Sequence, residues 1–312
     1  MSISLGSMSD TVSVKCNVCE FDDTEHVSDK GQFNLPLSVV ICKNCGLTYL
    51  NPRWTKEKYL KFYQEDYDKY YRPNMKTDDR VTEAASNPII LRIKERELFR
   101  KEAQHILDIG SGEGNNLKAL RQVYKKARFY AIEPSPEAQE SLKREHVEIL
   151  HHDVDGDWDT TNKGKFDLIV MRHVLEHMMD PVETLKKIAS CLSENGVFYV
   201  AVPNCLNPTA ELESKWFRTV HTYYFNKYSL ANALKKAQLH PIHAIEGDKY
   251  ERREIFILAK KPDQPLDMHI SSDHFMEQQQ VFTDRLKVER SLINVLRRKV
   301  TKVFQDVRHL SD

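Results

Sequence analysis

The sequence has no excess of charge of either sign, because 46 lysine and arginine residues are matched by 46 aspartate and glutamate residues. This balance argues against the overall positive field that draws proteins to DNA or RNA. The sequence also lacks any apolar run near the ~18 residues that a membrane-spanning helix needs. Residues 1–10 have neither the basic region nor the apolar stretch of a secretory signal. We therefore expect a soluble protein of the cytoplasm.

Cysteine is scarce, with six in 312 residues, yet four of the six form two Cys-x-x-Cys pairs, Cys16 with Cys19 and Cys42 with Cys45. Two thiolates three positions apart on a turn can bind one metal ion together, and two such turns complete a tetrahedral site. The expected reducing compartment favours metal binding over disulfides. Since four thiolates leave no open position for chemistry, the sequence predicts a structural Zn²⁺ in a zinc-ribbon module over residues 1–50.

An aromatic segment follows the cysteines. Tyr59, Phe62, Tyr63, Tyr67 and Tyr70 recur at spacings of three and four, which places them on one face of a helix. Such a face can pack onto the next domain, or it can form a wall for a flat ligand such as a sugar ring. Both interpretations stay open, and residues 51–101 are predicted to form a helical linker that covers the substrate.

Apolar strand-like runs alternate with helical patterns between residues 102 and 262, which predicts a parallel sheet with crossover helices. Strands are expected at 105–109, 128–133, 147–151, 166–171, 196–202, 242–246 and 254–259, with the last two as an antiparallel pair. Helices are expected at 116–125, 136–145, 182–191 and 229–237. In such sheets, ligands bind at the carboxyl ends of the strands.

The most informative segment spans residues 106–115 and reads Ile-Leu-Asp-Ile-Gly-Ser-Gly-Glu-Gly-Asn. It is typical of a buried strand that enters a tight turn and opens a helix, with Gly110, Gly112 and Gly114 leaving the backbone bare for a ligand. The third glycine comes one residue earlier than in a dinucleotide fingerprint, and Asp108 would repel a phosphate. An acid beside a bare backbone suits a cation, such as an ammonium or a sulfonium group.

This segment resembles motif I of the class I methyltransferases that use S-adenosylmethionine (SAM). The resemblance implies an α/β fold with a Rossmann-like, seven-stranded methyltransferase sheet and SAM as cofactor. Glu133 ends the second strand, where an acid can accept hydrogen bonds from both ribose hydroxyls. The residues that the resemblance assigns to the cofactor site are Asp108, Gly110, Gly112, Gly114, Glu133, Asp153, Val154 and Arg172, with Asp153 and Val154 at the adenine.

The segment 171–181, at the end of the fourth strand, resembles the corresponding motif of methyltransferases that act on quinones and sugars. It has no Asn-Pro-Pro-Tyr sequence, which counts against a nucleobase nitrogen as acceptor. A hydroxyl acceptor needs a general base, and histidine suits that role. We favour His221, in a segment similar to the His-x-x-x-Phe of relatives, then His173, with Tyr224 as an assisting group.

Together with Asn51-Pro52-Arg53 and the paired cysteines, residues 16–260 resemble bacterial-type SAM methyltransferases with an N-terminal four-cysteine motif. Many of these modify sugars, polysaccharides or secondary metabolites. Members that C-methylate keto sugars carry a further large C-terminal domain, so the sequence favours O-methylation of a saccharide or a similar small-molecule hydroxyl, as in polysaccharide biosynthesis. One alternative is a zinc-ribbon RNA methyltransferase, which the acidic segment 20–41 disfavours. Another is a non-catalytic scaffold.

Residues 263–312 are predicted to form a linker and an amphipathic helix. Ile293, Leu296, Val300, Val303, Val307 and Leu310 repeat by threes and fours, as in a coiled coil, and the same helix is basic. We expect this helix to form a homo-oligomer or to dock a partner protein, with contact at the inner membrane surface as a further option. The alternative is a helix folded back onto its own domain.

Overall fold

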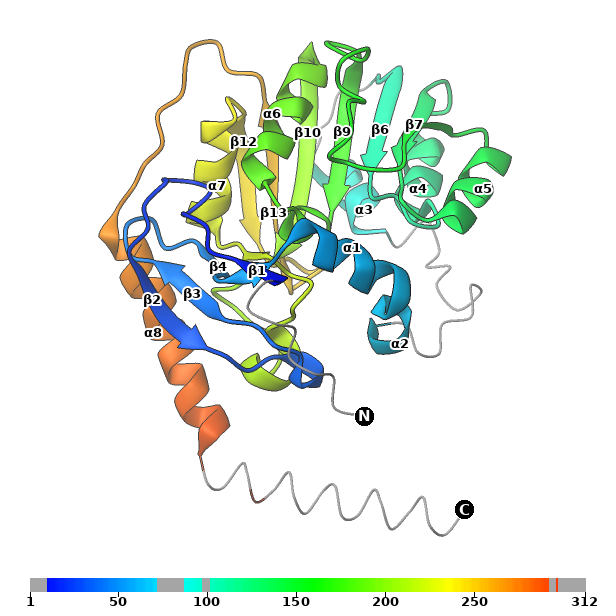
Figure 1. Cartoon of the computed structure of the whole chain (residues 1–312). Helices are drawn as coiled ribbons and strands as arrows, with labels where there is room; N and C mark the ends of the chain where they lie inside the picture. Colours follow the sequence, from blue (N-terminus) through cyan, green and yellow to red (C-terminus); the bar gives the residue numbers. More distant parts are fainter. Residues whose placement is uncertain (1–9, 72–86, 97–101, 292–295, 297–312) are drawn as a thin grey trace.

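The computed structural model describes residues 10–71, 87–96, 102–291 and 296. Its centre is a seven-stranded sheet with helices on both faces, and a smaller sheet and the long helix α8 (Ser272–Arg290) lie beside one end of it (Figure 1). Among the described residues, no helix is both long and apolar enough to cross a membrane.

The central sheet has the strand order β12-β13-β10-β9-β6-β7-β8. In chain order its strands are β6 (His105–Ile109), β7 (Arg128–Ile132), β8 (Glu148–His151), β9 (Phe166–Arg172), β10 (Leu192–Pro203), β12 (His240–Glu246) and β13 (Glu254–Lys260). Strand β13 runs antiparallel to both of its neighbours, whereas the pairs formed by β6 to β10 are parallel. This confirms the predicted methyltransferase sheet with its antiparallel end.

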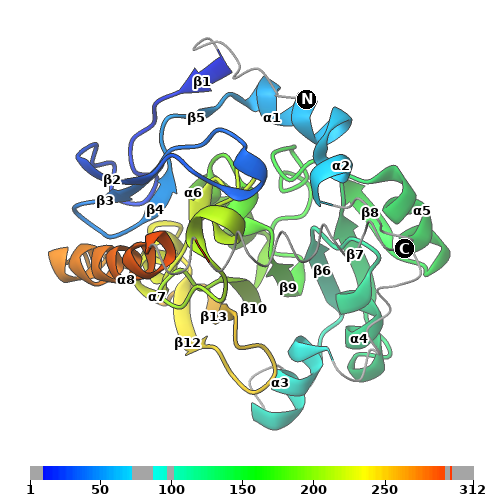
Figure 2. The same ribbon diagram turned by 90° about the horizontal axis from the view of Figure 1, so that it is seen from below.

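Successive side chains of the central strands point to opposite faces of the sheet and pack into two separate hydrophobic cores. Ile106 of β6 packs with the helices of one face, and Leu107 packs with those of the other. The first face carries α3 (Pro88–Arg96), α4 (Asn115–Val123) and α5 (Pro136–Arg144), and the second carries α6 (Pro181–Cys191) and α7 (Lys227–Lys236). Figure 2 shows these layers from the end of the sheet where the smaller sheet lies.

The predicted aromatic helix forms as two pieces, α1 (Lys56–Glu65) and α2 (Tyr67–Tyr71). The side chain of Thr55 caps α1 by accepting a hydrogen bond from the backbone N–H of Lys58. Short strands precede the helix, with β1 (Thr11–Val12) paired to β5 (Arg53–Trp54).

The smaller sheet has four strands in the order β11-β4-β3-β2. Three of them, β2 (Thr24–Ser28), β3 (Val39–Cys42) and β4 (Thr48–Leu50), come from the N-terminal cysteine segment. The fourth, β11 (Tyr223–Tyr224), comes from the chain that follows β10. The cysteine segment therefore shares a sheet with the segment that carries His221.

Helix α8 packs back onto its own chain. Phe282 and Leu286 are buried with residues of β3 and of the short helix η5 (Leu212–Trp216). Glu289 occupies a buried position because its carboxylate accepts hydrogen bonds from the backbone N–H groups of Leu212 (2.7 Å) and Glu213 (3.1 Å). Apart from the exposed Leu296, the predicted heptad positions from residue 293 onward lie outside the described residues, so self-association through them stays a prediction.

Candidate functional site

The glycine loop between β6 and α4 leaves its middle residue open. All three glycines have positive φ angles, of 69° at Gly110, 51° at Gly112 and 76° at Gly114. A Cβ at Gly110 would collide with Val174 and one at Gly114 with Leu142, whereas a Cβ at Gly112 would meet nothing within 4 Å. Gly110 is therefore required for packing against Val174, the Leu142 side chain could shift to make room at Gly114, and Gly112 presents bare backbone to open space.

Glu133, at the end of β7, is fixed against this loop. Its Oε2 accepts a hydrogen bond from the backbone N–H of Gly112 (2.7 Å), and its Oε1 accepts one from that of Ser135 (3.0 Å). The residue is 5% exposed. Each carboxylate oxygen keeps a second lone pair, so the group can still accept hydrogen bonds from a ligand that lies on Gly112.

Asp108 has a buried carboxyl group whose hydrogen-bonding capacity is unsatisfied. Among the described residues neither of its oxygens has a hydrogen-bond partner. Burial raises its pKa to about 8, against the opposing effect of the Asn116 amide, and the charge of Glu133 adds to the rise. A cationic ligand at the loop would restore the ionised form, so the residues present fit the ammonium group of SAM.

The other predicted cofactor residues lie at the ends of β8 and β9. Asp153 is half-buried and its Oδ1 accepts the backbone N–H of Asp155 (2.9 Å), while Val154 packs at the edge of the core. The guanidinium of Arg172 is held by Glu254 (3.0 Å) and lies 3.9 Å from Glu251. Its positive charge is thus already compensated within the chain.

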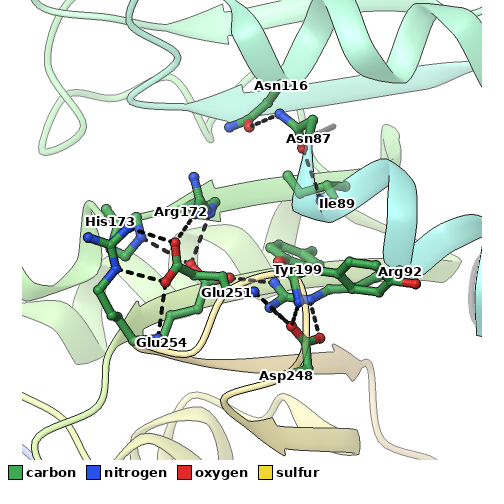
Figure 3. A network of polar contacts seen from close by, with 12 residues as sticks. Asn87, Ile89, Arg92, Asn116, Arg172, His173, Tyr199, Asp248, Glu251 and Glu254 are labelled. Carbon is green, nitrogen blue, oxygen red and sulfur yellow. Dashed lines mark hydrogen bonds and ion pairs between the residues drawn. The ribbon is translucent and has the colours of Figure 1, made fainter. Parts of the chain in front are cut away.

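A buried polar network that the sequence did not reveal joins α3 to the end of β9 (Figure 3). The fully buried Arg92 binds Asp248 (2.8 Å), the hydroxyl of Tyr199, and Glu254. Glu254 in turn binds Arg172 and His173, and these cations bring its pKa to about 2 although burial alone would raise it. The only hint of this network in the sequence is that an arginine, Arg92, interrupts the apolar stretch 89–93.

His173 is held as a cation by two carboxylates. Its Nε2 lies 3.0 Å from Glu254, and its Nδ1 lies 3.6 Å from Glu176. Burial alone would lower the pKa of His173, but the two acids outweigh this effect and raise the pKa to about 9. A ring that is protonated at neutral pH cannot accept a proton, so this environment disfavours the role of general base.

His221, by contrast, meets His177 and Glu176, and we call these three residues the acceptor cluster. One ligand atom from each lies within 4.8 Å of the others, and the two histidine rings stand edge to face with their centroids 4.7 Å apart. Burial, with the charge of His177 adding, lowers the pKa of His221 well below its usual value. Glu176 and His177 end the short helix η4 (Leu175–His177), and they were not among the predicted site residues.

The aromatic helix both packs and reaches this cluster. Tyr59 and Phe62 are buried against Trp54, as expected for simple packing. Tyr63 is 40% exposed, and its hydroxyl lies 3.3 Å from Nδ1 of His177. Tyr224, the predicted assisting group, is buried and bonded through its hydroxyl to the backbone N–H and carbonyl of Arg218, at 2.7 and 3.0 Å.

The four predicted zinc ligands come together. The sulfur atoms of Cys16 and Cys45 are 3.5 Å apart, those of Cys19 and Cys42 are 3.4 Å apart, and all four lie within 4.8 Å of one another. None of them forms a disulfide. Gly46 follows with a φ of 75°, and a Cβ there would lie 2.6 Å from a carbonyl oxygen of α8. The donor set fits one tetrahedral thiolate-bound ion such as Zn²⁺.

Hydrogen bonds join the cysteine segment to both of the chain segments that form the acceptor cluster. Arg53 donates one hydrogen bond to the hydroxyl of Tyr223 (2.9 Å) and another to the carbonyl of Met179 (2.8 Å). Leu50 donates its backbone N–H to the carbonyl of Thr222 (3.0 Å), and the Thr222 hydroxyl binds the carbonyl of Met178 (2.7 Å). These bonds connect residues that are far apart in the sequence.

The sheet order and the glycine loop define the fold as that of the class I SAM-dependent methyltransferases. Residues 80–244, just over half of the chain, match the family described as "Methyltransferase domain", and the chain belongs to this family. A solved structure of similar fold is the 1,6-didemethyltoxoflavin-N1-methyltransferase of Burkholderia thailandensis, with bound 1,6-didemethyltoxoflavin and S-adenosylhomocysteine. The likeness has a TM-score of 0.51 at 19% identity and covers 76% of this chain and 100% of that one.

Two curated relatives match shorter parts. N-methyltransferase 4 of Papaver somniferum is 30% identical over 112 residues, which is 34% of this chain and 31% of the relative. A ubiquinone biosynthesis O-methyltransferase of Coxiella burnetii is 27% identical over 126 residues, 38% of this chain and 51% of the relative. The chain thus spans between about a third and a half of the length of these relatives.

Proposed function

We propose that the chain transfers a methyl group from SAM to a small-molecule acceptor. The observation that carries this proposal is the buried carboxyl group of Asp108, which has no hydrogen-bond partner among the described residues, together with the open backbone of Gly112 in the loop that follows it. SAM supplies a methyl group on a positively charged sulfur. In our proposal, Asp108 neutralises the ammonium end of the cofactor, Gly112 lies against it, and Glu133 accepts the ribose hydroxyls.

Asp153 and Val154 are proposed to bind the adenine, as the family resemblance implies. Arg172 is proposed to act on the cofactor side only through its ion pair with Glu254, because its guanidinium is engaged there. The Cys16, Cys19, Cys42 and Cys45 thiolates are proposed to hold a structural Zn²⁺. Its role would be to support the acceptor cluster, because β4 of the cysteine segment pairs with β11.

For the acceptor, we propose a hydroxyl group of a saccharide or a similar small molecule. The acceptor oxygen attacks the methyl carbon in line, the carbon–sulfur bond breaks, and its electron pair stays on sulfur to give S-adenosylhomocysteine. The hydroxyl proton passes to His221, which lies in the acceptor cluster next to His177. Support comes from the polar cluster beside the partly exposed Tyr63, and from the O-methyl transfer in ubiquinone biosynthesis that the name of the Coxiella burnetii relative states.

Two measurements test this function. Calorimetry should detect SAM binding to the wild-type chain and none to Gly110→Arg, because any side chain there collides with Val174. An absence of binding to the wild type would favour the non-catalytic scaffold. Transfer from labelled SAM should then be compared across saccharide, quinone-like and RNA panels. Transfer to RNA alone would contradict the proposed acceptor and favour the zinc-ribbon RNA methyltransferase.

A further inference from the structure

The acceptor cluster has the composition of a metal site. Glu176, His177 and His221 each offer one ligand atom, and these atoms lie within 4.8 Å of one another. From this geometry we propose that the three side chains bind a divalent transition-metal cation that holds the acceptor hydroxyl. The inference rests on the proposed methyl transfer and adds a second metal, distinct from the ion at the four cysteines.

Glu176 gives an independent indication of a missing partner. The residue is 2% exposed, and among the described residues its Oε2 has no hydrogen-bond partner. Its other oxygen lies 3.6 Å from Nδ1 of His173, so only one side of the carboxylate is compensated. A buried carboxylate oxygen without a partner is costly, and a cation bound there would remove that cost.

His177 is oriented as a metal-binding histidine. Its Nδ1 lies 2.8 Å from the carbonyl oxygen of Val220, so this nitrogen carries the proton and donates it. The opposite nitrogen, Nε2, then keeps a free lone pair. Histidines that bind metals usually donate their other ring N–H to a carbonyl or a carboxylate in this way.

The donor set selects the kind of cation. Two imidazole nitrogens and one carboxylate oxygen suit Mn²⁺, Fe²⁺, Co²⁺ or Zn²⁺, whereas Mg²⁺ prefers oxygen ligands alone. Three protein ligands leave coordination positions open, in contrast to the four thiolates of the cysteine site. An open position is what an acceptor hydroxyl needs in order to bind.

The location of the cluster matches this role. Val174, two residues before Glu176, fills the space beside Gly110 of the glycine loop. On another side, Tyr63 of α1 lies 3.3 Å from His177. The cation would therefore lie between the loop proposed to bind SAM and the aromatic helix proposed to face the acceptor.

A bound cation changes how the proton leaves. A hydroxyl on a divalent cation has a lowered pKa, so it can lose its proton to solvent water and attack the methyl carbon as an alkoxide. The lone pair of His221 is then used for coordination, and the cation replaces direct proton transfer to that histidine. The products remain the methyl ether, S-adenosylhomocysteine and one proton.

Mn²⁺ binding to the full chain, followed by electron paramagnetic resonance, tests the inference. The chain is loaded with one equivalent of Zn²⁺, which the four thiolates bind first, so the cysteine site should not take up the Mn²⁺ probe and the acceptor cluster stays available to it. We expect one Mn²⁺ to bind the wild type. Glu176→Gln should weaken this binding at least ~10-fold, as expected for a lost charged ligand. The matched control, Glu183→Gln, changes an exposed acid on α6 and should bind Mn²⁺ like the wild type.

Zinc content and SAM affinity are measured on the same samples to verify that each variant is folded. If SAM binds the wild type but Mn²⁺ does not, or if Glu176→Gln binds Mn²⁺ as tightly as the wild type, the metal inference is wrong and the proposed function stands. If SAM fails to bind the folded, zinc-loaded wild type, the proposed function fails, and with it the inference that rests on it.

Discussion

The two sides of the molecule are built in different ways. The cofactor side, formed by Asp108, the glycine loop and Glu133, comes from two adjacent parallel strands and the turns that follow them. The acceptor cluster combines η4 with the segment before β11, and it is supported by residues of α1 and of the cysteine segment. One side depends on local sequence, and the other depends on contacts between distant segments. Substitutions should therefore affect the two sides separately.

Loss of the cysteine site is expected to give the largest difference between the effect on acceptor methylation and the effect on SAM affinity. Cys42→Ser should lower the rate of acceptor methylation about 100-fold or more, because β3 and β4 lose part of the ligand set that is proposed to support them beside β11. SAM affinity, measured by calorimetry, should stay within about twofold, as for distant and independent sites. The control is Cys191→Ser, a buried cysteine outside the four-cysteine group. A parallel loss of SAM affinity would show that the cysteine segment supports both sides.

Gly112→Ala tests the cofactor side, and Gly164→Ala is its matched control. Gly112 and Gly164 both have positive φ angles and open space where a Cβ would lie. Alanine should strain each backbone by about 1–2 kcal/mol. Only at Gly112 should the methyl group meet the cofactor, which we expect to weaken SAM binding about 10- to 100-fold. Equal SAM affinities for Gly112→Ala and Gly164→Ala would contradict the proposed position of SAM.

The pKa of Asp108, raised to about 8, predicts a pH dependence on the cofactor side. The folded chain holds this proton more tightly than the unfolded chain, so the stability of the unliganded protein should fall as pH rises from about 4 to 8. SAM binding must release the proton. Affinity should therefore increase about tenfold per pH unit below pH 8 and level off above it.

Calorimetry in buffers of different ionisation enthalpy measures that proton release directly. At pH 7 we expect the wild type to release about 0.9 proton per bound SAM at Asp108. Asp108→Asn has no carboxyl group to titrate, so it should bind SAM weakly and lack the release from this position. An unchanged release in that variant would assign the proton to another group.

The smallest effect is expected at Arg53, on the acceptor side. Arg53→Lys can keep only one of the two hydrogen bonds that connect Tyr223 with Met179. Losing one hydrogen bond from the charged guanidinium costs about 1.5 kcal/mol, so the KM for the acceptor should rise about tenfold while SAM affinity is unchanged. Arg252→Lys, at an exposed position, should leave both constants unaltered. A change in SAM affinity without a change in the KM for the acceptor would contradict the proposed independence of the cofactor side and the acceptor side.

The sequence predicted the central sheet well because each strand and helix has a local pattern. Strand 105–109 and the glycines after it were predictable, since the turn requires residues without side chains. The four cysteines were predictable from their spacing. The network of Arg92 with Glu254 was not, because its members are separated by 162 positions and no local pattern marks the pair.

Contacts between distant residues also explain why the roles of the histidines could not be predicted from the sequence. His173 and His221 could both be proposed as bases from the sequence, but their surroundings differ. Two acids raise the pKa of His173, whereas burial and a neighbouring histidine lower that of His221. Glu176 was overlooked because its missing partner is visible only in three dimensions.

The pairing of β4 with β11 also has a consequence for biosynthesis. Arg53 and Tyr223, which this contact brings together, are 170 positions apart. At a translation rate of ~5–20 residues per second, the N-terminal segment waits roughly 10–30 s before its partner strand is made. During that time one edge of β4 is unpaired, and such an edge invites association with other chains. Early capture of the proposed Zn²⁺ by the four cysteines would give the nascent segment a defined shape through this interval, and the yield of folded protein is then expected to depend on the supply of zinc during synthesis.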